Sequence, residues 1–242
     1  MIYVVSRKRK EENIKKDYPN AIILDITSKS AYAKKLSPFY PHGGIPIPFS
    51  EGLTAESVEG IWQGLKVFEH EDVNFDSFKN SSMQNLKRTV RKLGYPKGHR
   101  KGVNGNELLD YLSARILIYL PTYKWVLDNV PDVHSIVERI RIKAQESDIV
   151  LLDYNTNHDF RNLSSPLSHA ALVKLYIEGD YPQPDLEMEL QRAKNEAINL
   201  APNISINKRK KKRKDHKIKM ASFPHFLINL SERGEKPWEL SE

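Results

Sequence analysis

Ile149-Val150-Leu151-Leu152-Asp153-Tyr154 is the stretch that decides the fold. A continuous apolar run of this length predicts a strand that is central in its sheet and covered on both faces. The run leads into a polar loop at residues 155–159. Asp153 therefore stands at the carboxyl end of a buried strand, where open α/β sheets tend to place ligands. The same position also suits a structural aspartate that accepts hydrogen bonds from loop amides, and both interpretations stay open at this point.

Two more strands are predicted near the N-terminus, at residues 3–5 and 21–26, with a charged helical segment at 9–16 between them. This order is typical of a β-α-β unit, and we expect the two strands to pair in one sheet. Further helices are expected at residues 55–69, 82–93, 106–130, 134–145, 165–177 and 185–200. Pro121 should kink or end the third of these helices. Ser165 and Pro166 suit the start of the helix at 165–177, and Gly179 suits its end.

These elements predict an α+β or α/β fold, a mostly helical single domain around a small sheet. We expect residues 1–200 to form this domain. Residues 201–242 should form a basic segment followed by an apolar segment that packs back on the domain.

The composition excludes several classes of protein. The chain of 242 residues contains no cysteine, which removes disulfides, thiolate metal sites and cysteine nucleophiles. No apolar run is long enough to cross a membrane and the N-terminus turns charged early, so we expect a soluble, cytoplasmic protein without a membrane partner. The histidines show no zinc-binding spacing, and we expect neither a metal site nor a cofactor.

The formal charge of +7 is concentrated in one run, KRKKKRKDHKIK at residues 208–219. A solvated tail or a nuclear-import signal would explain such a run. Contact with a polyanion also explains it, because lysine and arginine displace counterions from phosphates. We favour a nucleic-acid partner, DNA. The predicted contacts are Lys208, Arg209, Lys210, Lys211, Lys212, Arg213 and Lys214.

A polar stripe on the helix predicted at 55–69 is the first candidate site. Glu59, Gln63 and Lys66 are spaced i, i+4 and i+7, which places them on one helix face directed at a cleft or at water. Such a stripe is also common on solvated helices. Thr54 is a candidate cap for this helix. A loop at residues 37–44, rich in turn formers, lies just upstream and presents Phe39 and Tyr40.

Three other residues are weaker candidates. Asp159 lies in a cluster of asparagine, histidine and aspartate that is ordinary turn chemistry. His169 would lie in the first turn of its helix and could equally be a packed, hydrogen-bonded histidine. Arg100 opens a loop at residues 100–106 that mixes positive charge with glycine, and this loop could hold a phosphate or be a plain surface loop.

The order of these motifs resembles the NADAR family, whose members hydrolyse N-glycosidic bonds of nucleotide-like substrates. The resemblance covers residues 36–178. It rests on Leu36-Ser37-Pro38-Phe39-Tyr40-Pro41, on Ser57-Val58-Glu59 with Gln63 and Lys66, and on Val150 to Asp153 through Asp159 followed by Pro166-Leu167-Ser168. Gly60 stands where the family usually has histidine, Asp153 replaces a glutamate-like position, and a tryptophan-glycine pair after the second acid is missing. The resemblance thus implies the N-glycosidase fold with a divergent substrate.

The resemblance assigns roles to the candidate residues. Cleaving a C1′–N bond builds positive charge on the sugar, which a carboxylate stabilises. Glu59 would take that role, and Asp153 or Asp159 would activate water. Gln63 and Lys66 would orient the sugar or phosphate, with Arg100 and His169 as further substrate contacts. Phe39 and Tyr40 would stack on the extruded base, unless both rings are core.

We therefore expect a DNA glycosylase that removes a modified nucleobase and leaves an abasic site, with defence against viruses that carry modified DNA as a setting. Two alternatives remain. One is an ADP-ribosyl-guanine glycohydrolase or an N-glycosidase of a free nucleotide metabolite. The other is a nucleic-acid-binding module without catalysis.

Overall fold

The computed structural model describes residues 1–207, with side chains up to residue 196. The basic run at 208–219 lies outside the described residues. The described chain forms two units, one of residues 1–183 and one that begins at Pro184 and contains α9 (Leu186–Asn207). α9 crosses the domain boundary that the sequence suggested at residue 200. The first unit is a mixed α+β fold, as predicted.

The strand at the deciding stretch is central, as predicted. β8 (Ile149–Asp153) lies between β1 (Ile2–Ser6) and β2 (Ile22–Asp25), and all three strands are parallel. The two N-terminal strands share this sheet, but the expectation that they pair with each other is wrong because β8 separates them. The three carboxyl ends meet at one edge, where the backbone N–H of Arg7 donates to the carbonyl of Asp153.

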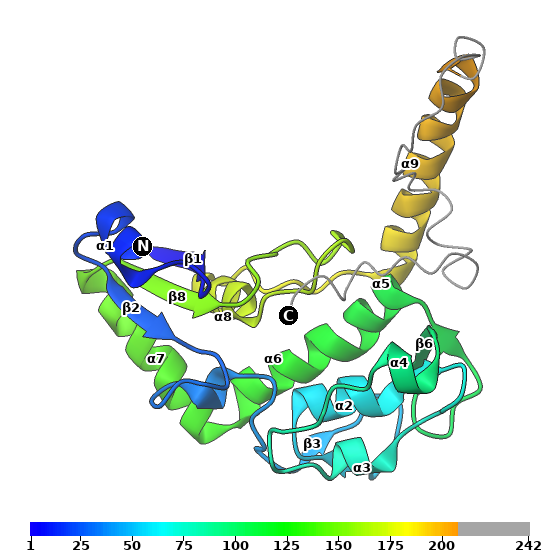
Figure 1. Ribbon diagram of the computed structural model, residues 1–242, viewed down its shortest axis with the longest axis horizontal. Coiled ribbons are helices and arrows are strands. Elements are labelled where there is room, and N and C mark those ends of the chain that lie inside the picture. The colour runs from blue at the N-terminus through cyan, green and yellow to red at the C-terminus, as the bar shows by residue number, and fades with distance from the viewer. Residues whose placement is uncertain (208–242) are drawn as a thin grey trace. The chain divides into compact units, whose positions relative to one another are not determined.

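Helices cover both faces of this sheet. α1 (Glu11–Asp17) packs Ile14 against Val5 and Val150 on one face. The side chains of a strand alternate, so Asp153 belongs to the other face, where α8 (His169–Glu178) contacts β8. α7 (Pro131–Glu146) also contacts β8 and runs along the sheet (Figure 1). Burial on both faces explains why the sequence of β8 is uniformly apolar up to its last residue.

Residues 34–109 build a second group of small elements. η1 (Lys34–Leu36) precedes the hairpin of β3 (Ile45–Pro46) and β4 (Thr54–Ala55). α2 (Val58–Leu65) follows and contacts α3 (Phe75–Phe78). A second sheet, antiparallel, consists of β5 (Lys66–Phe68), β6 (Pro96–Arg100) and β7 (Leu108–Leu109). α4 (Val90–Leu93) immediately precedes β6.

One helical run contacts the second group of elements. α5 (Tyr111–Ala114), the π-helical segment η2 (Arg115–Tyr119) and α6 (Leu120–Asn129) follow one another without a break. α2 contacts η2, and α5 contacts β6. In the π-helical turn the N–H of Leu120 donates to the carbonyl of Arg115, five residues back. The widened turn accommodates Pro121, which has no N–H and would clash with a regular preceding turn.

Several predicted helix bounds are wrong. The helix predicted at 55–69 ends at Leu65, and its cap is Ser57, whose Oγ accepts from the N–H of Gly60. Thr54 lies instead in β4. Of the helix predicted at 82–93 only α4 is helical. The helix predicted to start at Ser165 starts at His169, with Ser168 as its cap.

Candidate functional site

The polar stripe of α2 is buried. Glu59, Gln63 and Lys66 expose 8%, 5% and 8% of their surface. Glu59 and Gln63 lie on α2, whereas Lys66 is the first residue of β5. Burying two charged side chains and an amide is unfavourable unless they have polar partners, so the stripe is no solvated helix face.

The orientation of the Gln63 amide is fixed from two sides. Its Nε2 donates to Oε1 of Glu59 over 2.9 Å, and its Oε1 accepts from the backbone N–H of Arg88 over 3.3 Å. Burial raises the pKa of the Glu59 carboxyl, while the hydrogen bond from Gln63 and the positive charges of Lys66 and Lys87 oppose this rise. The carboxyl is therefore held in place by Gln63, and its pKa lies above that of an ordinary glutamate because of its burial.

Lys66 belongs to the same buried cluster. In the second sheet it lies opposite His99 of β6. Burial lowers the pKa of Lys66 to about 8, since the attraction of Glu59 offsets only part of the effect and Arg88 and Lys87 add to it. A lysine with a pKa this close to neutrality can release and recover a proton at physiological pH.

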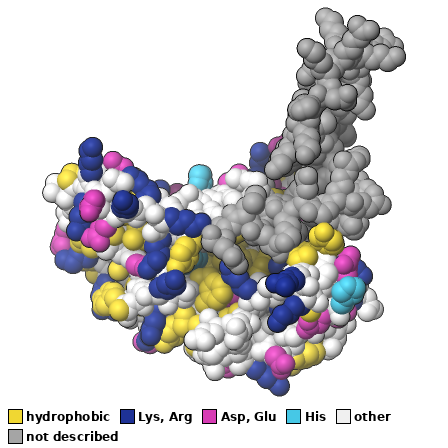
Figure 2. Space-filling view, in the orientation of Figure 1, with side chains coloured by type: hydrophobic (Ala, Val, Ile, Leu, Met, Phe, Trp, Pro, Cys, Tyr) yellow, Lys and Arg dark blue, Asp and Glu magenta, His cyan; other side chains and the backbone are white. Residues whose placement is uncertain are grey.

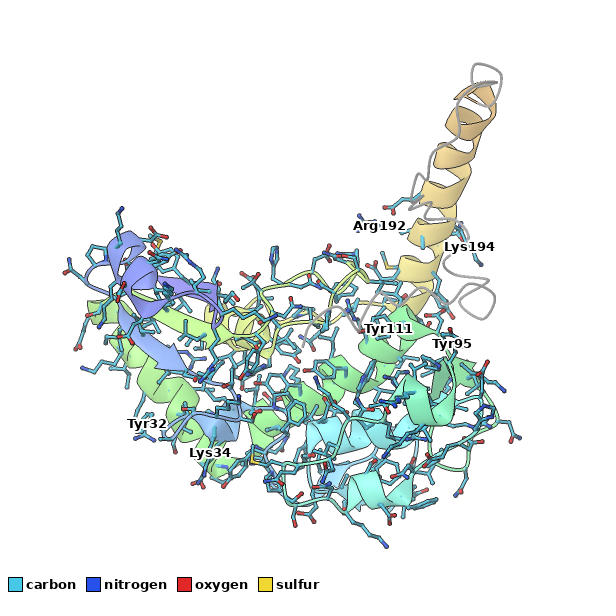
Figure 3. All side chains as sticks on the ribbon, in the orientation of Figure 1. Tyr32, Lys34, Tyr95, Tyr111, Arg192 and Lys194 are labelled. Carbon is cyan, nitrogen blue, oxygen red and sulfur yellow. The ribbon has the colours of Figure 1, made fainter. Side chains whose placement is uncertain are left out.

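Aromatic rings surround this cluster. Trp62, half-buried, lies three residues after Glu59 on α2, and its ring centroid is 3.9 Å from that of His99. Edge contacts join Trp62 to Tyr111 and Tyr119, with centroids 5.7 and 5.6 Å apart. Figure 3 shows Tyr111 on α5. We refer to Glu59, Gln63, Lys66, Trp62, His99 and Tyr119 as the Glu59 cluster.

His99 is the unusual member of the Glu59 cluster. It is 2% exposed, and within the described part of the chain neither of its ring nitrogens has a hydrogen-bond partner. Burial lowers the pKa of His99 well below its ordinary value, and the charges of Lys66 and Arg88 lower it further. The ring is therefore neutral at physiological pH and keeps one donor and one acceptor unused.

The loop at residues 37–44, which we call the aromatic loop, lies beside the Glu59 cluster, as the sequence predicted. The backbone N–H of Glu59 donates to the carbonyl of Pro38 over 2.8 Å, and the backbone N–H of Gly43 donates to the carbonyl of Glu56 over 3.0 Å. Phe39 and Tyr40 are half-buried, so neither ring is fully core. A loop with partly exposed rings at the first turn of α2 is suited to contact a flat ligand.

Tyr119 is a buried tyrosine whose pKa is affected by both Glu59 and Asp153. Its pKa is raised well above the ordinary value, first by burial and then by the negative charges of Glu59 and Asp153. The residue ends the π-helical segment, and such segments are frequent at functional sites. The charges of Glu59 and Asp153 therefore both act on the buried hydroxyl of Tyr119.

Asp153 is, however, fully engaged. Its Oδ2 accepts from the Ser168 hydroxyl over 2.7 Å and from Nδ1 of His169 over 2.9 Å, and its Oδ1 accepts from the N–H of Tyr154 over 2.7 Å. Nε2 of His169 lies 3.0 Å from the carbonyl of Ile26. Both histidine nitrogens face acceptors, which identifies His169 as a doubly protonated imidazolium.

The pKa shifts of this pair agree with that assignment. Burial alone would raise the pKa of Asp153, but the charge and hydrogen bonds of His169 and Ser168 bring it below its ordinary value. Burial alone would lower the pKa of His169, and the charge and hydrogen bond of Asp153 outweigh it, so this pKa is raised. The geometry favours the structural interpretation for both residues.

Arg115 is a buried residue that the sequence did not single out. It is 1% exposed and lies on the π-helical segment. Its guanidinium donates to the carbonyls of Phe160, Asn162 and Ser165. The guanidinium therefore fixes the loop between β8 and α8, including the segment around Ser165 that the sequence predicted to be helical.

The remaining candidates, Asp159 and Arg100, form their described hydrogen bonds with residues outside the Glu59 cluster. Asp159 is half-buried, and its Oδ1 accepts from the N–H of Arg161, an ordinary turn contact. Arg100 binds Asp72 through two nitrogens, over 3.0 and 2.6 Å, so its charge is already compensated. Arg100 and Asp72 also line a surface cavity of about 400 Å³, which Glu59, Gln63 and Lys66 do not line.

Two further findings concern only the described residues. In that part of the chain no group of three or more histidine, aspartate or glutamate side chains is arranged to hold a metal ion. Nor does any helix there have the length and apolar character needed to cross a membrane.

The fold and the buried cluster define a mixed α+β domain with a polar centre between α2, β5, β6 and η2. The chain belongs to a family of unknown function, DUF6939, whose family model matches residues 6–173. The match spans the Glu59 cluster, the aromatic loop and the Asp153–His169 pair. Comparison with curated proteins finds no match, and comparison with solved structures finds none either.

Proposed function

We propose that this protein is an N-glycosidase that acts on DNA, a DNA glycosylase with Glu59 as its catalytic carboxylate. The observation that carries the proposal is a buried carboxyl, held by Gln63, in one cluster with a lysine whose pKa is about 8 and with aromatic rings. Catalytic acids and bases commonly show such perturbed pKa values, although structural ion pairs show them too.

The proposed reaction is hydrolysis of the C1′–N bond. The bond electrons leave with the nucleobase, which takes up a proton, while a water oxygen bonds to C1′ and gives up a proton. Positive charge grows on the sugar in between, and Glu59 as carboxylate would stabilise it. Lys66 as ammonium would supply the proton to the departing base. Both roles need Glu59 ionised and Lys66 protonated at the same pH.

The aromatic groups would hold the base. Phe39 and Tyr40 are half-buried beside the first turn of α2, and Trp62 is half-buried over His99. An extruded base stacks on such rings and presents its edge to hydrogen-bonding groups. His99 has an unused donor and acceptor for that edge. Asp153 takes no part in this proposal, because hydrogen bonds within the fold already occupy its oxygens.

DNA is proposed as the substrate because of the basic run at 208–219, which suits phosphate contacts. Modified bases of viral DNA are the proposed targets, in the cytoplasm of a cell that the enzyme defends. The resemblance to the NADAR family supports cleavage of an N-glycosidic bond but does not identify the nucleobase.

The test is a substrate panel. The full chain is incubated with unmodified DNA, DNA with glucosylated hydroxymethylcytosine and ADP-ribosylated DNA. Released bases are identified by mass spectrometry, and abasic sites by alkaline cleavage. A released base with an equal number of abasic sites is the expected result. Release of ADP-ribose alone would instead assign the ADP-ribosyl-guanine activity, and no product from any DNA would contradict the proposal.

The basic run separates the DNA enzyme from an enzyme of free metabolites. Deleting residues 208–219 should weaken DNA binding and lower turnover at limiting DNA. Activity on a free nucleotide that the deletion leaves unchanged, with none on DNA, would assign the metabolite activity.

A further inference from the structure

A second basic surface lies within the folded unit, on the segment Lys87–Lys97. Four of its cations are exposed: Lys87, Arg91, Lys92 and Lys97. Figure 2 shows dark blue side chains on the side of the molecule where α4 lies, with magenta and cyan side chains beside them. We refer to these four residues as the α4 cations.

The α4 cations differ from many surface cations of this protein. Lys15 pairs with Glu11, Lys101 with Glu107 and Lys143 with Glu146, at 2.6, 2.8 and 3.1 Å. In the part of the chain that the structure describes, none of the α4 cations has a carboxylate within ion-pair distance. Lys87, Arg91 and Lys92 are close in sequence, and like charges without ion pairs repel each other, so this part of the segment is suited to an anionic partner.

Arg88 fixes this segment to the Glu59 cluster. Its guanidinium donates to the carbonyls of Gln63, over 2.8 Å, and of Lys66, and its backbone N–H donates to the Gln63 side chain. The next residue toward the N-terminus is Lys87; burial raises the pKa of Glu59 and lowers that of Lys66, and the charge of Lys87 opposes the first shift and adds to the second. The α4 cations therefore begin at the edge of the buried cluster.

An exposed ring accompanies the α4 cations. Tyr95 is 39% exposed and lies between α4 and β6, where Figure 3 labels it. The Oε2 of Glu69 accepts from the N–H of Tyr95 over 3.0 Å, and Lys97 lines the surface cavity together with Glu69, Glu71 and Asp72. Basic side chains with an interspersed aromatic ring are typical of surfaces that follow a nucleic-acid strand.

We propose that the α4 cations form a phosphate-binding surface of the folded unit, which holds the DNA backbone beside the Glu59 cluster. This surface is separate in sequence from the run at 208–219. The inference rests on the proposed function for its partner, DNA, but its evidence is independent of that run. Each phosphate contact neutralises one phosphate and releases counterions, which makes binding salt-dependent.

The test compares two double variants of the full chain that remove the same charge. Arg91→Gln with Lys92→Gln removes two α4 cations, and Lys15→Gln with Lys143→Gln removes two cations that already have carboxylate partners. All four side chains are exposed, so both variants should keep the wild-type circular dichroism spectrum. Fluorescence anisotropy measures the affinity for short unmodified duplex and single-stranded DNA between about 50 and about 200 mM salt.

The α4 variant should lose affinity for DNA, and its slope of log affinity against log salt should become shallower by roughly 1.8 for duplex DNA. The slope of the control variant should equal that of the wild type. Equal slopes for both variants, with either form of DNA, would overturn the proposal. The form of DNA that shows the larger change is the one the surface binds.

The phosphate-binding surface and the proposed glycosidase activity can fail independently of each other. If the substrate panel gives no product while the α4 variant still loses salt-dependent binding, the surface stands and the glycosidase assignment falls. If product forms and the α4 variant binds like the wild type, the glycosidase assignment stands and the surface falls.

Discussion

The buried pair of Asp153 and His169 allows a quantitative prediction for the change Asp153→Asn. Asp153 is 5% exposed and His169 is 7% exposed. The substitution keeps the shape of the side chain but removes the negative charge beside a buried imidazolium. It also weakens the charge-assisted bonds from Ser168 and His169 to Oδ2, at 2.7 and 2.9 Å. Breaking a buried ion pair by removing one partner costs about 3–5 kcal/mol, and we expect the unfolding free energy to fall by that amount.

The loss should depend on pH. The pKa of Asp153 is lowered in the folded protein, so its contribution exists above the unfolded value of about 3.9 and is lost as pH falls through the folded pKa. The pKa of His169 is raised, so its contribution is complete below about 6.5 and is lost as pH rises through the folded pKa. The difference between wild type and variant should therefore be largest between about pH 4 and about pH 6.5.

Urea denaturation of both proteins at several pH values measures this difference. Asp148→Asn is the control, because Asp148 also forms an ion pair but at an exposed position, with 46% of its side chain accessible. The control should change stability by less than about 1 kcal/mol. An Asp153→Asn protein that is as stable as this control, or a loss that stays constant from acid to alkaline pH, would refute the reasoning.

Three further predictions concern α2 and its neighbours. The rate of the proposed reaction should fall above about pH 8, because Lys66 loses its proton there. In a Lys66→Arg variant that retains activity, this fall should disappear. An alkaline limb that the variant leaves unchanged would contradict the role of Lys66. Ser57→Ala removes the cap that holds the N–H of Gly60 and should lower the unfolding free energy by about 1 kcal/mol in urea denaturation, and a neutral result would contradict the capping. Gly64→Ala places a Cβ 2.2 Å from the ring of Phe78 and should cost about 1–3 kcal/mol, visible as a lower Tm, whereas an unchanged Tm would show that the ring moves freely.

The elements that sequence patterns predicted well are those whose own residues determine them. β8 is a continuous apolar run, and α7 carries a regular buried face of Val133, Ile136, Val137 and Ile140. The periodicity of such segments agrees with their tertiary environment, so no competing contact changes the outcome.

Two elements were missed, one because of a tertiary contact and one because of local hydrogen bonding. Lys66 continues the helical pattern of α2, yet it leaves the helix because β5 pairs with β6 opposite His99. Residues 82–85 form a bend instead of a helix, because the Asn80 side chain accepts from the N–H of Ser82 and because Met83 and Asn85 have positive φ. The pairing of β5 with β6 has no local signal in the sequence, whereas the Asn80–Ser82 contact is a local alternative to helix formation that the hydrophobic pattern does not reveal.

The candidate site was predictable in part. The spacing of Glu59 and Gln63 predicted one helix face, and the structure places both in one buried hydrogen-bonded pair. That His99 belongs to the cluster was not predictable, because only the pairing of β5 with β6 brings this histidine to Trp62. Trp62 itself had a detectable signal, because it lies three residues after Glu59 and four before Lys66.

The most direct test of the central claim is the change Glu59→Gln, with Glu56→Gln as the control, a glutamate that lies three residues earlier and just before the helix cap Ser57. On the DNA that releases a base in the substrate panel, single-turnover rates and DNA affinities are measured for wild type and both variants. The account predicts that Glu59→Gln lowers the rate by about 10²–10³-fold or more while DNA affinity is kept, because only the transition-state charge loses its partner. Glu56→Gln should react at the wild-type rate. A Glu59→Gln protein that releases the base as fast as the wild type would remove Glu59 from the mechanism and contradict the account.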